Sequence, residues 1–105
     1  IENKKIVLID DSMVRGTTMK HIVKMLKENG AKEVHIRIAS PMVINSCFWG
    51  IDIPDKAEII GANRTKNDIK VLLDADSLEF ISLEFLLNYL GKKGKNYCFH
   101  CFQVT

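Results

Sequence analysis

The chain has 105 residues, of which 47% are hydrophobic, so it carries enough apolar side chains for one small globular core. Its 15 basic and 13 acidic residues leave a net charge of +2 and are scattered along the chain, which gives no electrostatic reason to expect nucleic acid or a membrane surface as a partner. No apolar run approaches the roughly 18 residues that a membrane span needs, and residues 1–5 do not resemble a secretion signal, so we expect a cytosolic protein.

The first half of the chain predicts a strand, a helix and a second strand. Ile6–Ile9 is a short apolar run without polar alternation, which is typical of a strand buried on both faces of a parallel sheet. Apolar residues then recur at helical spacing over about Thr17–Asn29, where the following glycine favours a helix end. Residues 34–38 alternate between apolar and polar and stop before Pro41, as expected for a second strand. This order of elements is a βαβ unit.

The second half predicts two further helices and a third strand. Thr65–Asp68 resembles a capping box in front of a helix over residues 66–74, and Leu78–Ile81 is a candidate strand. Ser82 can cap a helix whose leucines recur three and four residues apart until Gly91. We expect residues 92–95 to form a polar linker, which divides the chain into a domain, 1–91, and a tail, 92–105. Such alternation predicts an α/β domain with a parallel sheet flanked by helices and a ligand site at the carboxyl ends of the strands.

The loop after the first strand brings acids, a glycine and hydroxyls together. Asp10 and Asp11 begin it, Gly16 allows the backbone to approach a ligand closely, and Thr17 and Thr18 add hydroxyls where a helix starts. Unpaired N–H groups at a helix start favour an anion such as phosphate. Two adjacent carboxylates would repel that anion unless they face sugar hydroxyls or bound magnesium. A phosphorylated sugar therefore suits both halves of the loop.

The segment Ile6–Thr18 resembles the signature loop of the type I phosphoribosyltransferases: four apolar residues, two acids, and a stretch that ends in Gly-Thr-Thr. The resemblance implies part of the type I phosphoribosyltransferase fold and the binding of phosphoribosyl pyrophosphate. It implies that the two aspartates hold the ribose 2- and 3-hydroxyls, directly or through Mg2+, and that the rest of the loop surrounds the 5-phosphate. The implied binding residues are Asp10, Asp11, Ser12, Met13, Val14, Arg15, Gly16, Thr17 and Thr18.

Two other interpretations of the acidic pair are open. It is compatible with an ordinary polar turn that caps a helix. It is also compatible with a receiver module of bacterial signalling, in which an acidic pair binds magnesium beside a phosphorylated aspartate. A receiver needs that aspartate at the end of a later apolar strand, and the nearest candidates, Asp52 and Asp55, have no such strand before them. Neither alternative explains the stretch Arg15–Thr18.

The three cysteines have a spacing typical of metal ligation. Cys98 and Cys101 are separated by two residues, and Cys47 lies far upstream. Three thiolates are one short of a tetrahedral site, so free thiols, a redox pair and three ligands of a zinc site are all open. None of the three histidines has a partner in the sequence that implies catalysis, and we predict no catalytic histidine.

Further stretches resemble the amidophosphoribosyltransferases rather than the base-salvage members of the type I family. They are Ser40–Met42, Cys47–Pro54, Glu58–Ile60 and Ala75–Leu78. The resemblance spans nearly the whole chain and implies the C-terminal part of the phosphoribosyltransferase domain. One branch of that family holds a four-iron four-sulfur (4Fe-4S) cluster with cysteines in this pattern. The resemblance therefore implies that Cys47, Cys98 and Cys101 are cluster ligands and that the fourth ligand lies in missing upstream sequence.

The resemblance also implies a reaction and partners. In this family a glutaminase domain releases ammonia, which displaces pyrophosphate from phosphoribosyl pyrophosphate to give 5-phosphoribosylamine in the first step of purine synthesis. The sequence begins at Ile1 rather than methionine, so we expect a piece of a longer, homo-oligomeric enzyme that lacks the glutaminase domain and the rest of the transferase domain. Such a piece is expected to be inactive alone, and no catalytic residue is assigned. A non-catalytic regulator with the same fold and ligand is the alternative.

Overall fold

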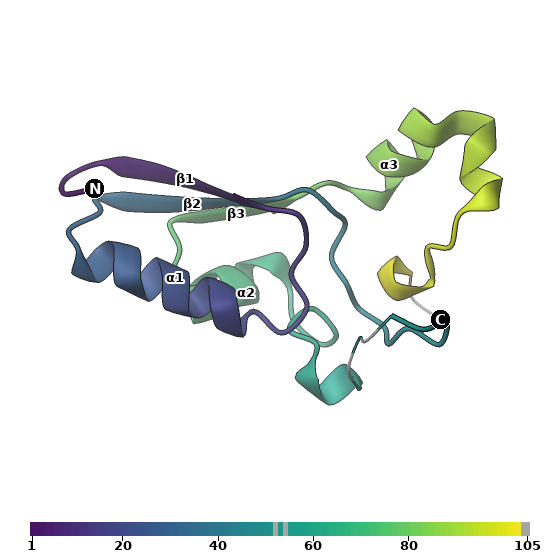
Figure 1. Cartoon of the computed structure of the whole chain (residues 1–105), viewed down its shortest axis with the longest axis horizontal. Coiled ribbons are helices and arrows are strands. Elements are labelled where there is room, and N and C mark those ends of the chain that lie inside the picture. The colour runs from purple at the N-terminus through teal and green to yellow at the C-terminus, as the bar shows by residue number, and fades with distance from the viewer. Residues whose placement is uncertain (52, 54, 104–105) are drawn as a thin grey trace.

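The computed structural model describes residues 1–51, 53 and 55–103 as a three-stranded parallel sheet with helices. The strands lie in the order β1-β2-β3, and the first two are joined by α1 (Figure 1). The predicted α/β fold with a parallel sheet is therefore confirmed. The elements are β1 (Lys5–Asp10), α1 (Thr17–Glu28), β2 (Glu33–Ile38), η1 (Lys56–Glu58), α2 (Lys66–Leu73), β3 (Ser77–Phe80), α3 (Leu83–Leu90), η2 (Gly91–Asn96) and η3 (His100–Phe102), where η marks 3-10 helices.

The core lies between one face of the sheet and the helices α1 and α2, which cover that face together (Figure 1). α1 buries an apolar stripe at helical spacing, and β2 buries every second residue against it. Burying one such side chain stabilises the fold by about 1.5–3 kcal/mol, so this interface fixes where α1 begins relative to the end of β1. The buried members are Met13, Met19, Val23, Leu26, Val34, Ile36, Ile38, Ile60, Ile69, Leu73 and Leu78.

Side chains cap the helices where the sequence predicted caps. Thr65 Oγ1 accepts a hydrogen bond from the Asp68 N–H at 3.1 Å, and Asp68 Oδ2 accepts one from the Thr65 N–H at 3.0 Å. These reciprocal bonds form the predicted capping box and lower the pKa of Asp68. Ser82 Oγ accepts from the Phe85 N–H at 3.0 Å at the start of α3. Local sequence therefore determines both helix starts.

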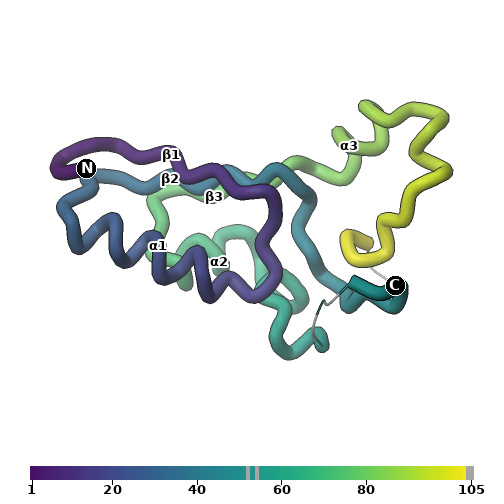
Figure 2. The backbone as a smooth tube through the Cα atoms, viewed as in Figure 1, coloured from purple at the N-terminus to yellow at the C-terminus, as the bar shows by residue number. Residues whose placement is uncertain are grey.

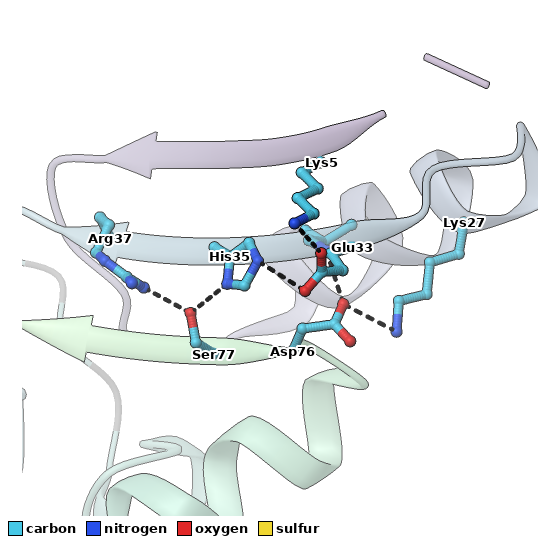
Figure 3. Close-up of polar contacts among 8 residues, drawn as sticks. Lys5, Lys27, Glu33, His35, Arg37, Asp76 and Ser77 are labelled. Atoms are coloured by element: carbon cyan, nitrogen blue, oxygen red, sulfur yellow. Dashed lines mark hydrogen bonds and ion pairs between the residues drawn. The ribbon is translucent and has the colours of Figure 1, made fainter. Parts of the chain in front are cut away.

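The other face of the sheet carries a row of polar contacts across the three strands (Figure 3). Glu33 lies 3.4 Å from Lys5 Nζ and 3.5 Å from His35 Nε2. The Ser77 hydroxyl accepts from Arg37 Nη1 at 2.9 Å and lies 2.7 Å from His35 Nδ1. Since this hydroxyl accepts from the arginine, its own proton is available to the imidazole nitrogen. The row links each strand to its neighbour.

The prediction that β1 is buried on both faces is wrong. Val7 and Ile9 are 60% and 73% exposed on the side away from α1 and α2. β1 is an edge strand of the sheet, and within the described residues both core helices lie on the opposite face. An apolar run indicates a strand, but it does not indicate which elements cover that strand.

The C-terminal tail turns back toward the loop that follows β2 (Figure 2). The expected linker at residues 92–95 lies within the 3-10 helix η2, which continues directly from α3. The next 3-10 helix, η3, contacts the loop, because the N–H groups of Ile44 and Asn45 donate to the Cys101 carbonyl at 2.7 and 3.1 Å. No helix in the described part of the chain is long and apolar enough to cross a bilayer.

Candidate functional site

The predicted anion loop lies between the carboxyl end of β1 and the N-terminus of α1. Gly16 occupies the N-cap position of α1 with φ 77° and ψ −1°, a left-handed conformation that favours glycine. No side chain caps this helix, and its first turn contains no acidic residue. The N–H groups of the first turn, with the Thr17 and Thr18 hydroxyls beside them, are therefore suited to an anion.

These residues surround a cavity of about 310 Å³. Its lining consists of Asp10, Ser12, Met13, Val14, Arg15, Gly16, Thr17, Thr18 and Met19. Every predicted loop residue except Asp11 is in this lining. The Asp11 carboxylate instead accepts from the Ser12 hydroxyl at 3.3 Å, and the Asp11 N–H donates to Asp10 Oδ1 at 2.8 Å. Both carboxylates are exposed, one facing the cavity and one beside it.

Two buried contacts hold the loop against the core. The Met13 side chain is only 5% exposed and belongs to the core, so this residue offers its backbone rather than its side chain to a ligand. The Ile60 N–H donates to the Val14 carbonyl at 2.9 Å. A Cβ on Gly16 would lie 2.6 Å from Ile60 Cδ1, which shows how closely Ile60 approaches the loop. Sequence reasoning missed Ile60 as a support of the loop.

Basic residues lie beside the loop. Arg15 lines both the loop cavity and an adjoining hollow of about 470 Å³, where Lys20, His21 and Arg64 also lie. The Arg15 Nε lies 3.9 Å from a Glu58 carboxylate oxygen, and both side chains are about half exposed. Such an ion pair contributes about 0–1 kcal/mol, so a bound anion can compete for the guanidinium.

The three thiols are free, and the tail brings two of them toward the third. The backbone contacts of Ile44 and Asn45 with Cys101 place the tail next to the segment that contains Cys47. Burial raises the pKa of the Cys101 thiol, and the nearby Cys47 and Cys98 thiols raise it further. Ligand binding by these thiols must therefore displace protons.

The donor chemistry suits an iron–sulfur cluster better than a single ion. Among residues 1–51, 53 and 55–103, no group of three or more His, Cys, Asp or Glu side chains could hold a metal ion. A cluster of four irons spaces its ligands more widely than one ion does, and thiolates are its usual ligands. The set of Cys47, Cys98 and Cys101 is compatible with that group and does not form a zinc site by itself.

The remaining residues that the sequence singled out lie apart from the loop cavity or outside the described residues. Asp52 and Pro54 are outside those residues, and Asp55 is exposed before η1. His35 belongs to the polar row on the sheet. His100 lies with its ring centroid 5.3 Å from that of Phe48, which joins the tail to the loop after β2.

Comparisons with known proteins relate this arrangement to one enzyme family. No family model matches the chain. Amidophosphoribosyltransferase 1, chloroplastic, of Arabidopsis thaliana is 46% identical over 97% of this chain and 18% of its own length. The chain is a homologue of one segment of the amidophosphoribosyltransferases. An amidophosphoribosyltransferase of Methanocaldococcus jannaschii is 45% identical over 96% of this chain and 21% of its own length.

A solved amidotransferase structure has the same fold. It is described as the glutamine phosphoribosylpyrophosphate (PRPP) amidotransferase from B. subtilis complexed with ADP and GMP, and it matches with a TM-score of 0.87 at 42% identity over 98% of this chain. This chain covers 24% of that structure and about a fifth of the curated amidophosphoribosyltransferases. The predicted phosphoribosyltransferase fold is confirmed, and the comparisons favour this interpretation of the loop over a receiver module.

Proposed function

We propose that this chain forms the phosphoribosyl-binding, C-terminal part of an amidophosphoribosyltransferase, with residues 1–91 in the transferase domain and residues 92–105 as its tail. The observation that carries the proposal is the loop cavity at the end of β1, in a chain 46% identical to an amidophosphoribosyltransferase. The cavity combines an uncapped helix start, two threonines and an exposed carboxylate.

The loop suits the two chemically different halves of phosphoribosyl pyrophosphate. The 5-phosphate would accept hydrogen bonds from the N–H groups at the start of α1 and from the Thr17 and Thr18 hydroxyls. Asp10 and Asp11 would accept from the ribose 2- and 3-hydroxyls, directly or through Mg2+. Magnesium prefers oxygen ligands and is usually bound by one or two carboxylates together with substrate phosphates, so this exposed pair fits it.

The chemical role of these residues is to position the sugar. Transfer at the anomeric carbon passes through a cationic, oxocarbenium-like state as pyrophosphate leaves, and nearby carboxylates stabilise positive charge. Bound magnesium would neutralise charge on the leaving pyrophosphate. Ammonia, and the groups that bind pyrophosphate, would come from the rest of a homo-oligomeric enzyme, so we expect no transfer by this chain alone.

The thiols complete the proposal. Cys47, Cys98 and Cys101 would supply three ligands of a 4Fe-4S cluster, and a fourth would come from outside this chain. Because the thiols lie in the tail and in the loop after β2, while the anion cavity lies after β1, the cluster's role would be structural. Iron and acid-labile sulfide in the purified longer protein would support this part of the proposal, and their absence after anaerobic reconstitution would contradict it.

Calorimetric titration with phosphoribosyl pyrophosphate and Mg2+ tests the binding site. We expect Asp10→Asn/Asp11→Asn to weaken magnesium-dependent binding by roughly tenfold or more, because charge-assisted contacts are lost. Asp74→Asn/Glu84→Gln is the matched control, since it removes the same charge at exposed sites away from the loop and should leave binding unchanged. Equal affinities for the two double variants would refute the assignment of the loop.

The same ligand distinguishes the enzyme from the regulator alternative. The longer protein that contains this segment should convert phosphoribosyl pyrophosphate and ammonia to phosphoribosylamine with release of pyrophosphate. Tight binding without pyrophosphate release would support the regulator instead.

A further inference from the structure

Asn45 is a buried polar residue at the contact between the tail and the loop after β2. Its side chain is enclosed, with the residue only 4% exposed. The side-chain Nδ2 donates to the His100 carbonyl at 3.0 Å and also to the Gln103 carbonyl. An amide nitrogen has two hydrogens, and this side chain directs both of them to the tail.

The backbone of the same short segment strengthens the contact. The Ile44 and Asn45 N–H groups both donate to the carbonyl of Cys101, which lies between the two carbonyls that accept from the Asn45 side chain. Every acceptor in this set is a main-chain oxygen of the tail. No thiol takes part in these bonds, although Cys98 and Cys101 flank or belong to the turn that they hold.

We propose that Asn45 is the positioning residue that docks the C-terminal turn and thereby sets Cys98 and Cys101 beside Cys47. The docking depends on amide-to-carbonyl bonds and therefore exists before the thiols bind any group. A cluster or other thiophilic ligand then meets a preformed arrangement instead of creating it. Docking does not rest on the proposed function, whereas the use of the docked thiols as iron ligands does.

The physical reason lies in the cost of an unmet buried group. Replacing Asn45 with alanine leaves two tail carbonyls without their donor in a buried contact, which is costly because water is excluded there. Asn45→Asp keeps the size of the side chain but turns a carboxylate toward two carbonyl oxygens, so it replaces attraction with repulsion. Asn45→Gln keeps the amide on a longer stem and should recover part of the contact.

Amide hydrogen exchange by NMR tests the docking without thiol chemistry. The background is the whole chain with Cys47→Ser, Cys98→Ser and Cys101→Ser, in which the amides of residues 44 and 45 should remain protected. In that background, Asn45→Ala and Asn45→Asp should exchange these two amides roughly tenfold to thirtyfold faster. The β2 amides of Ile36 and Ile38 should stay within about twofold of the parent.

Controls and refuting outcomes are defined by the same spectra. Asn63→Ala and Asn63→Asp make the same changes at an exposed asparagine and should leave residues 44 and 45 protected. Loss of protection in the serine background alone would overturn the proposal, because the thiols would then hold the tail. Unchanged exchange in both Asn45 variants would overturn it, and so would equal acceleration in β2, which would assign Asn45 to global stability.

A second measurement reports the spacing of the thiols directly. With the three cysteines restored, a short bifunctional thiol reagent should link Cys47 to Cys101, as read by mass spectrometry of the digested chain. Asn45→Asp should slow this linkage roughly tenfold, and Asn45→Gln should recover part of the rate. Equal rates in all variants would refute positioning by Asn45. Titration with phosphoribosyl pyrophosphate should be unaffected by these variants, so failure of the ligand site and failure of the docking are distinguished.

Discussion

Gly16→Ala should destabilise the chain through two separable effects. The left-handed backbone at φ +77° costs an alanine about 1–2 kcal/mol relative to glycine. The new methyl would lie 2.6 Å from Ile60 Cδ1, well inside the normal contact distance of two carbon atoms. Overpacking costs about 1–3 kcal/mol, and the lower end applies because Cδ1 is the movable end of a side chain. We therefore expect a total loss of about 2–3 kcal/mol.

Urea unfolding followed by circular dichroism measures this loss, and two further variants separate its parts. Gly50→Ala places a methyl at φ +104° with nothing within 4 Å, so it reports backbone strain without the contact. Ile60→Val removes Cδ1 and should itself cost about 0.5–1.5 kcal/mol. In the Ile60→Val background, Gly16→Ala should cost about 1 kcal/mol less than in the parent, because the contact is gone.

The outcome that refutes this reasoning is additivity. If Gly16→Ala costs the same with isoleucine and with valine at position 60, the loop does not lie against that side chain as described. A cost equal to that of Gly50→Ala would lead to the same conclusion. A coupling of the expected sign would show that the anion loop and the Ile60 segment are held as one unit.

Two further predictions concern titrating groups. Hydrogen bonds from Thr65 lower the pKa of Asp68 below its ordinary 3.8, so its contribution to stability is present above that value and is lost as the pH falls through the folded-state pKa. Between about pH 5 and pH 2 the unfolding free energy from urea titrations should therefore fall more in the parent than in Asp68→Asn, and equal losses would contradict the capping box. Burial and the neighbouring thiols raise the pKa of Cys101, so it should react with iodoacetamide near neutral pH more slowly than the exposed Cys98. Peptide mass spectrometry at timed intervals checks the order, and faster alkylation of Cys101 would be the contrary result.

Much of the fold was predictable because its signals are local. The capping box at Thr65, the Ser82 cap and the alternation in β2 each involve residues within a few positions of one another. The covering of β1 was not predictable in this way, because it depends on where the helices pack. The 3-10 helix η2 gave no signal either, since its lysines and glycines have no apolar periodicity.

The candidate site divides in the same manner. The anion loop was predictable because its acids, glycine and threonines are consecutive in the sequence, and the cavity brings all of them except Asp11 together. Ile60 and Asn45 were missed because their partners lie far away in the chain. An asparagine two residues before a cysteine resembles an ordinary turn residue, and its role emerges only when residues 100–103 return to it.

The outer edge of β1 has a consequence for how this chain behaves in solution. β1 pairs only with β2 within the described residues, so the backbone N–H and C=O groups along its other edge have no strand beside them. Residues 6–9 carry no charge, and Val7 and Ile9 are exposed next to that edge. Such an edge is a template for adding a strand from another molecule. Self-association along β1, rather than any reaction at the loop, is therefore expected to limit the concentration at which the isolated chain stays monomeric.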